Sequence, residues 1–308
     1  MLESIQVVGG SVLTLFLLMA VGFFMGKRAL LSPQALSQLS TLLLYIVCPI
    51  IMINTFLEQD HTSRTVRMLL VAGMVMVGTY VLNMILIPIF FRRTPRAERG
   101  VMQFSAIYGN IGFMGIPLIS AVLGPEGMLV TVTGLAMFNI SVWTHGAFLM
   151  GGRAEVSLKK ALLNPGTIGF LVAIVLFGLH VELPGPVTDA LGYIGDLNTP
   201  LAMVVVGAQM AAVDLPSLFR DRRVYGVTAV KLLLIPAVTM LVLLPFGLDR
   251  VTYTAAVILS GCPVAGTASL FCQLTGKDTG LAARFITLST LLCIVTLPLT
   301  AMAAELLL

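Results

Sequence analysis

The residues most able to do chemistry in this chain lie between positions 106 and 118, inside an apolar segment long enough to cross a bilayer. That stretch carries an amide, three glycines and a proline, which are Gly109, Asn110, Gly112, Gly115 and Pro117. Proline removes a backbone donor, and glycine lowers helix propensity. Non-helical backbone in a membrane is tolerated only where protein or a water-filled cavity satisfies its polar groups. We therefore expect a broken helix that lines an internal cavity, with Asn110 at the break.

The chemistry expected at such a break is anion binding. Free N–H groups and a partial positive charge at the start of a half-helix suit a carboxylate. The Asn110 amide can donate to an anion or accept from a protonated acid. Its alternative role is to cap the half-helix, which requires no ligand. We expect Pro117 and Pro263 to break two helices. The residues expected to bind substrate around these breaks are Gly109, Asn110, Ile111, Gly112, Asn139, Cys262, Val264 and Ala265.

Two charged residues stand inside apolar segments. Lys231 lies roughly 12 Å deep, at 1.5 Å per residue from the nearer end of its segment, where a charge is costly unless it is paired, hydrated or snorkelled. It could attract an anion or replace a coupling cation, or its long stem could simply reach the interface. Asp196 could carry a proton or pair with Lys231. Its alternative role is hydrogen bonding to a helix break before Pro200.

The composition establishes the environment of the chain. Hydrophobic residues make up 58% and charged residues 10%, and the mean hydropathy is +1.02. A soluble domain carries about a quarter charged residues, so we expect an integral membrane protein without a nucleic-acid partner. The cysteines all lie in apolar segments, which favours small buried side chains over disulfides or a metal site. They are Cys48, Cys262, Cys272 and Cys293.

Ten membrane spans of about 20 residues fit the hydropathy pattern. They are expected at 5–25, 35–57, 67–91, 100–122, 127–150, 165–181, 187–212, 224–247, 251–273 and 281–306. Fourteen of the 18 Lys and Arg residues fall in loops after odd-numbered spans, and three fall in loops after even-numbered spans. By the positive-inside rule the odd loops are cytoplasmic. We therefore expect both termini outside, in a multi-pass protein of a bacterial inner membrane.

The two halves of the chain carry prolines in matching spans. The pairs are Pro49 with Pro200, Pro88 with Pro245, and Pro117 with Pro263. An odd number of spans per half forces the halves to insert with opposite orientation, and interrupted spans at matching positions point to a transporter's binding site. The sequence thus predicts an inverted repeat of five helices, with one repeat over 1–154 and the other over 155–308, and with broken helices 4 and 9 crossing.

These residues resemble the auxin efflux carrier family, which includes plant PIN-type carriers and bacterial members associated with malate or malonate. The stretch 110–118 is similar to that family's fourth-span signature, and 164–167 and 231–236 also match family motifs. The resemblance implies a scaffold of spans 1, 2, 6 and 7 at a homodimer interface, and a mobile transport domain of spans 3–5 and 8–10. It also implies elevator-type alternating access for a small organic anion. Gly109 replaces a proline of the plant members, and the third span has no charged residue between Arg67 and Arg92, so auxin itself is not expected.

The expected function is secondary transport of a mono- or dicarboxylate. We expect no cofactor, and the coupling ion could be a proton or sodium. No Walker-type phosphate loop is present, which argues against ATP as the driving force. One alternative is an intramembrane hydrolase, but the chain lacks a second intramembrane aspartate and a His-Glu-x-x-His motif. The other alternative is a sensor or receptor built on a transporter fold.

Overall fold

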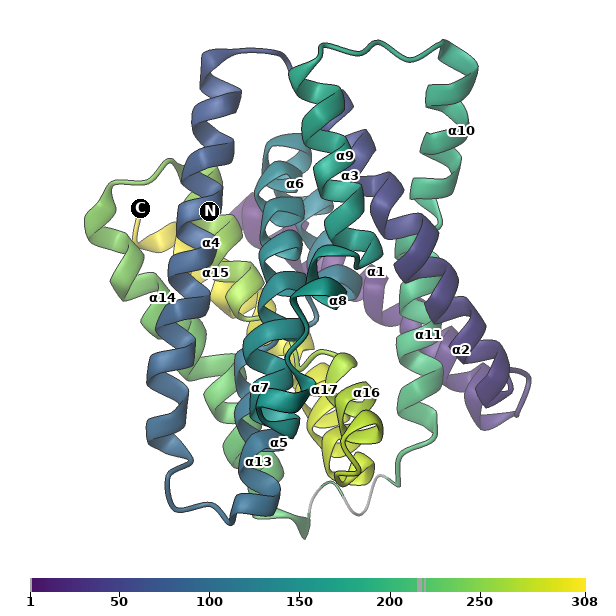
Figure 1. Cartoon of the computed structure of the whole chain (residues 1–308), viewed down its shortest axis with the longest axis vertical. Helices are drawn as coiled ribbons and strands as arrows, with labels where there is room; N and C mark the ends of the chain where they lie inside the picture. Colours follow the sequence, from purple (N-terminus) through teal and green to yellow (C-terminus); the bar gives the residue numbers. More distant parts are fainter. Residues whose placement is uncertain (1, 215–217, 219) are drawn as a thin grey trace.

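The chain folds into helices joined by short turns over residues 2–214, 218 and 220–308, which the computed structural model describes. In Figure 1 the helices α4, α6 and α11 run along the vertical axis of the view. Within the described part, strand-type pairing is limited to one antiparallel bridge between Gly109 and Val264. A helix satisfies all its backbone groups within one segment, as lipid requires. The predicted all-helical membrane class is therefore confirmed.

The α-helices follow in chain order. Those of the first half are α1 (Leu2–Lys27), α2 (Pro33–Leu42), α3 (Cys48–Leu57), α4 (Ser63–Phe90), α5 (Arg96–Ile107), α6 (Ile116–Ser141), α7 (Ala147–Gly151) and α8 (Leu158–Leu162). Those of the second half are α9 (Pro165–Gly178), α10 (Gly185–Asp196), α11 (Asn198–Ala211), α13 (Arg222–Ala229), α14 (Ile235–Leu243), α15 (Arg250–Ser260), α16 (Thr267–Leu274) and α17 (Thr279–Leu306).

Seven helical segments of the described chain are long and apolar enough to cross a membrane. They are Gly9–Lys27, Pro33–Leu57, Ser63–Phe90, Ile111–Gly151, Gly185–Ala211, Arg222–Phe246 and Thr279–Leu306. The fourth of these bends at Gly124, whose φ of 61° is the left-handed conformation that glycine favours. Three further expected spans correspond to shorter pieces: α5 with the start of α6, then α9, then α15 with α16. The ten-span inverted repeat stays a prediction.

Several prolines lie just after a widened, π-helical turn. The π-helical turns are η1 (Leu43–Val47), η2 (Ile111–Gly115), η3 (Val142–Gly146) and η5 (Val230–Leu234). Pro49, Pro117 and Pro236 are each the second residue of the α-helix that follows η1, η2 and η5. Proline lacks a backbone donor and clashes with the carbonyl four residues earlier. A π-helical turn removes this conflict by widening the helix locally. These helices therefore continue through their prolines.

Glycines allow the closest helix contacts away from the breaks. Side chains at Gly22 of α1 and Gly207 of α11 would collide with backbone atoms of the opposite helix, and one at Gly169 of α9 would lie 2.6 Å from Pro49 Cα. Apolar side chains gain little by packing together in lipid, so small residues that let helix backbones approach are what hold such helices together. The pairs α1–α11 and α3–α9 are therefore close-packed units.

Candidate functional site

The site is built where two interrupted helices meet. Helix α5 ends at Ile107 and helical structure resumes at Ile111, while α15 ends at Ser260 and α16 begins at Thr267. Two backbone hydrogen bonds join the interruptions: Asn110 N–H donates to Pro263 O at 2.7 Å, and Ala265 N–H donates to Tyr108 O at 3.0 Å. The first interruption precedes Pro117 by several residues, because η2 accommodates that proline. The second contains Pro263.

Asn110 caps the helix that restarts after the first interruption. Its Oδ1 accepts from Phe113 N–H at 3.2 Å, and its carbonyl accepts from Met114 N–H at 3.1 Å. This is the capping arrangement that stabilises a helix start. The Asn110 side chain is only half-buried, and its amide nitrogen has no hydrogen-bond partner within the described chain. Capping therefore uses the oxygen of the amide and leaves the two N–H donors for another acceptor.

The second interruption is held by side chains from other helices. Val264 N–H donates to the Ser289 hydroxyl of α17 at 3.0 Å, and both residues are buried. Cys262 is fully buried, and its thiol faces Ile258 O at 3.7 Å, so it packs as a small apolar residue. Ala265 is also buried. Ser289 was not singled out from the sequence, since one serine in an apolar span gives little signal.

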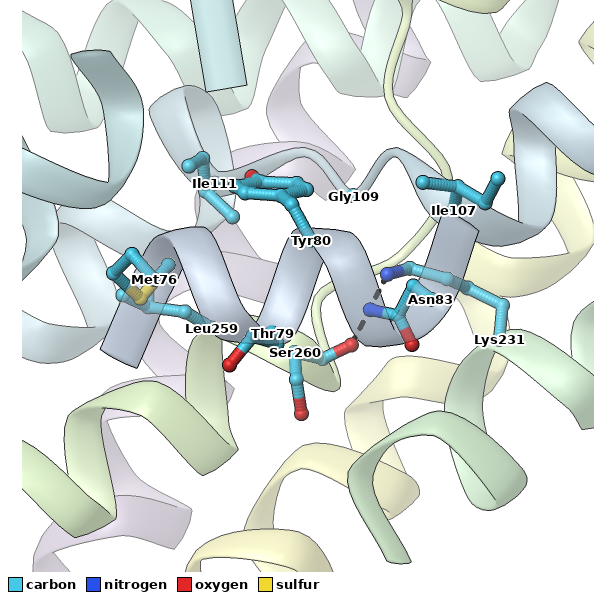
Figure 2. A pocket seen from close by; sticks show the side chains of 10 residues that line it. All are labelled: Met76, Thr79, Tyr80, Asn83, Ile107, Gly109, Ile111, Lys231, Leu259 and Ser260. Carbon is cyan, nitrogen blue, oxygen red and sulfur yellow. Dashed lines mark hydrogen bonds between the residues drawn. The ribbon is translucent and has the colours of Figure 1, made fainter. Parts of the chain in front are cut away.

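Lys231 lies inside the protein beside both interruptions. It comes from η5 and is 2% exposed. Its Nζ donates to Ser260 O, the last carbonyl of α15, at 3.0 Å, as the dashed line in Figure 2 shows. A Cβ placed on Gly109 would lie 2.9 Å from this nitrogen, so the glycine makes the approach of the ammonium to the first interruption feasible.

A small cavity of about 10 Å³ opens at this point, enough for roughly one water molecule. Figure 2 shows side chains of α4 and α15 gathered around it with Lys231. Its lining residues are Met76, Thr79, Tyr80, Asn83, Ile107, Gly109, Ile111, Lys231, Leu259 and Ser260. Of the expected substrate-binding residues, the cavity brings together Gly109 and Ile111.

Three residues of α4 that are not predicted as site residues from the sequence line this cavity. They are Thr79, Tyr80 and Asn83, and they stand in a segment without charged side chains between Arg67 and Arg92. Thr79 and Asn83 are four residues apart and therefore share one helix face. A polar pair at that spacing within an uncharged span was the signal that could have found them. Asn83 is 3% exposed, and its Oδ1 has no partner among the described residues.

Other expected site residues lie elsewhere. Asn139 contacts α9: its amide nitrogen would lie only 2.4 Å from a Cβ atom built on Gly166. Asp196 is exposed at the end of α10, and the structure does not bring it to Lys231. A Cβ on Gly112 would make only ordinary contact with Leu135, at 3.7 Å. Within the described ranges, no group of three or more His, Cys, Asp or Glu side chains could hold a metal ion.

An ion-pair network lies at the starts of α5 and α13, outside the apolar segments. Arg223 pairs with Asp221 at 2.7 Å and with Glu98 of α5 at 2.6 Å. The hydrogen bond from Arg223 is the main cause that lowers the pKa of Asp221, and the nearby charges of Arg223 and Arg284 act in the same direction. The network therefore ties α5 to the start of α13.

Comparison with known proteins gives a consistent result over the whole chain. The model of a family described as "Membrane transport protein" matches residues 7–159 and 152–301. An "Uncharacterized transporter" of Methanothermobacter thermautotrophicus is 21% identical over 294 residues, covering 94% of this chain and 96% of the relative. A protein of Rhizobium meliloti named "Putative malonate transporter" is 24% identical over 302 residues, covering 93% and 92%.

A third relative, "Uncharacterized transporter YfdV" of Escherichia coli K12, is 23% identical over 304 residues, covering 94% of this chain and 95% of the relative. These names describe transporters and not enzymes. Together with the apolar helices, they identify a multi-pass membrane protein. The chain belongs to this membrane transport protein family, that of the auxin efflux carriers that its sequence resembles.

Proposed function

We propose that the protein is a secondary transporter of a small organic anion, a mono- or dicarboxylate. The observation that carries the proposal is the pairing of two interrupted helices with the free amide donors of Asn110 at their junction. Half-helix starts with free N–H donors suit a carboxylate in a site shielded from water. The relative named for malonate supports the same substrate class.

We propose that the two interruptions belong to matching spans of an inverted repeat, with 1–154 and 155–308 as its halves, and ten membrane crossings. Alternating access would then follow by an elevator movement of spans 3–5 and 8–10 against spans 1, 2, 6 and 7. The small cavity at Lys231 supports a conformational step, because about 10 Å³ cannot admit a carboxylate solute.

We propose a homodimer formed through the scaffold. Helices α2 and α10 have no buried residues in the single chain, which supports their availability for such a contact. The protein would lie in a bacterial inner membrane with both termini outside, following the basic loops. It would use no cofactor. A proton or sodium gradient would drive transport, and Lys231 and Asp196 would be the charged residues involved in coupling.

The test of the substrate class is carboxylate-induced thermal stabilisation of the purified protein. Malonate, malate, succinate and an indole acid are compared in detergent, with uptake into vesicles as the second measurement. We expect at least one carboxylate to raise the melting temperature of the wild type. If none does and none is transported, the proposed function is wrong.

Asn110 variants separate binding from capping. Asn110→Ser retains a capping oxygen but loses the amide donors, whereas Asn110→Ala loses both. We expect Asn110→Ser to keep most of the wild-type stability and to bind the carboxylate about tenfold to hundredfold more weakly, as for one hydrogen bond to a charged group of about 1.5–3 kcal/mol. Wild-type affinity in Asn110→Ser would restrict Asn110 to capping.

A further inference from the structure

The side chain of Tyr108 connects the first interruption to the π-helical turn η3. Its backbone carbonyl accepts from Ala265 N–H of the second interruption, and its ring is fully buried. The hydroxyl at the end of that ring lies 2.9 Å from Ser141 O and 3.0 Å from His145 Nδ1. A Cβ on Gly146 would lie 3.1 Å from the Tyr108 ring, so this glycine lets η3 come close. One tyrosine thus joins the pairing of the two interruptions to a histidine.

The two contacts of the Tyr108 hydroxyl determine which nitrogen of His145 carries hydrogen. A hydroxyl has one proton, and the Ser141 carbonyl can only accept. The Tyr108 proton therefore points to Ser141 O, and the Tyr108 oxygen accepts from Nδ1–H of His145. The hydrogen bond made by one imidazole nitrogen fixes the state of the other, which leaves Nε2 to gain or lose a proton. We infer that Nε2 of His145 is a proton-binding site that Tyr108 links to the first interruption.

A proton on Nε2 strengthens this link and does not break it. Nδ1–H donates to Tyr108 whether His145 is neutral or charged, and a hydrogen bond from a charged imidazole is the stronger of the two. His145 is only half-buried, so the ring is not sealed inside the protein. Histidine is the side chain whose charge ordinarily changes between about pH 5 and 8. The junction therefore contains a group that can respond to a proton gradient.

No carboxylate neutralises a charge on His145 by direct contact. Among the ion pairs of the described chain, none includes this residue. The turn η3 packs against α6, α7 and α8, whose charged residues are Glu126, Lys159 and Lys160. Glu126 pairs with Arg64, and both lysines of α8 are exposed.

The Tyr108 side of the histidine is equally free of acidic groups. Tyr108 stacks with Tyr80 of α4 at 6.2 Å and packs against Phe104 of α5 at 4.7 Å. The charged residues of α5 all lie at its start, within 96–99, and those of α4 lie at its start as well. A proton on His145 therefore adds a positive charge near the junction that no described carboxylate cancels. Such a charge favours an anion bound there.

The proton site can be tested without any substrate, by nitrogen NMR of the purified protein labelled at histidine. The chain has three histidines, and His61→Asn and His180→Asn identify the signals of the other two. Neutral His145 should carry its hydrogen on Nδ1, and Nε2 should gain a proton as the pH falls from about 8 to about 5. In Tyr108→Phe this preference for Nδ1–H should be lost, because the acceptor is gone. A neutral His145 with its hydrogen on Nε2, or no titration in this range, overturns the inference.

The consequence for transport rests on the proposed function: the coupling ion is a proton, and His145 takes it up when a carboxylate binds. His145→Asn keeps an amide donor near the position of Nδ1 but cannot titrate, so its binding shows the pH dependence of the solute alone. Relative to this variant, the wild type should bind malonate, malate or succinate roughly tenfold more tightly near pH 5.5 than near pH 8. The matched control is His61→Asn, which should keep the wild-type pH dependence, since His61 stacks with Phe177 and His180.

The outcomes separate this inference from the proposed function. Equal pH dependence of carboxylate binding in wild type and His145→Asn overturns the coupling role and leaves the transporter proposal intact. If His145→Asn does not fold, Tyr108→Phe makes the same comparison, because it removes the link and keeps the histidine. Absence of carboxylate binding by the wild type at both pH values contradicts the proposed function, while the NMR titration without substrate still decides whether His145 is a proton site.

Discussion

The two helix interruptions differ in where their stabilising groups come from. At the first, between Ile107 and Ile111, the capping oxygen belongs to Asn110, a residue of the interruption itself. At the second, between Ser260 and Thr267, the stabilising side chains are Ser289 of α17 and Lys231 of η5. The first interruption is therefore encoded locally, while the second exists only in a packed protein.

The second interruption can move only together with the elements that stabilise it. Polar backbone groups that are unpaired in an apolar interior are costly, so the second interruption must keep α17 and η5 beside it. The first carries its cap with it. A movement that separated α15 from α17 would expose Val264 N–H without a partner. The turn η5 and the helices α15 and α17 are therefore expected to move as one body.

The largest effect on stability should come from removing the Ser289 hydroxyl, which α17 provides to the second interruption. Ser289→Ala leaves the buried Val264 N–H unpaired, which should cost about 1–3 kcal/mol of unfolding free energy. The matched control is Ser260→Ala. The Ser260 hydroxyl bonds only within its own helix, to Val257 O, and that carbonyl also accepts from Gly261 N–H at 3.1 Å. Melting temperatures in detergent should fall for Ser289→Ala and change little for Ser260→Ala. Equal losses would show that the second interruption does not depend on α17.

A somewhat smaller effect is expected from filling the space at the first interruption. A Cβ on Gly109 lies 2.9 Å from Lys231 Nζ, so Gly109→Ala should cost about 1–2 kcal/mol through crowding, softened because the lysine end can shift. Gly112→Ala meets only Leu135, at 3.7 Å, and should be neutral or slightly stabilising.

The cause of the Gly109 effect can be separated from general crowding by a double-mutant cycle. If the new methyl group acts on the ammonium, Gly109→Ala should cost clearly less in a Lys231→Ala background, since residues in contact show non-additive effects. Additive losses in melting temperature would mean that the methyl group disturbs the backbone of the junction instead, with Cys262 O, 3.1 Å from the same point, as the affected atom.

Local signals account for what the sequence could predict. Glycine and proline lower helix propensity wherever they stand, so interruptions near Asn110 and Pro263 were foreseeable. So was the capping alternative for Asn110, which depends on residues three positions apart. The exact place of the first interruption was not foreseeable from Pro117, because a π-helical turn carries the helix through that proline.

Tertiary contacts account for what the sequence could not predict. Ser289 and Asn83 are single polar residues in apolar spans, and their meaning depends on which helix they face. Asn139 was expected beside the junction but contacts Gly166 of α9, since a span prediction fixes neither the rotation nor the neighbour of a helix. Lys231 was recognised as unusual, but its carbonyl partner 29 residues away in sequence was not.

The smallest effect concerns the ionic link between the start of α5, which leads to the first interruption, and the start of α13, which leads to η5 and Lys231. Asp221 caps α13 and binds Arg223, which also reaches Glu98 of α5. The Arg223 hydrogen bond lowers the pKa of Asp221 from its ordinary 3.8, so the stabilisation is present above that value and is lost as pH falls through the lowered pKa. The melting-temperature difference between wild type and Asp221→Asn, which keeps a capping oxygen, should therefore be small at pH 7 and vanish in strong acid. In an Arg223→Gln background, this pH dependence should largely disappear. If it persists there, Asp221 is stabilised by a group other than Arg223.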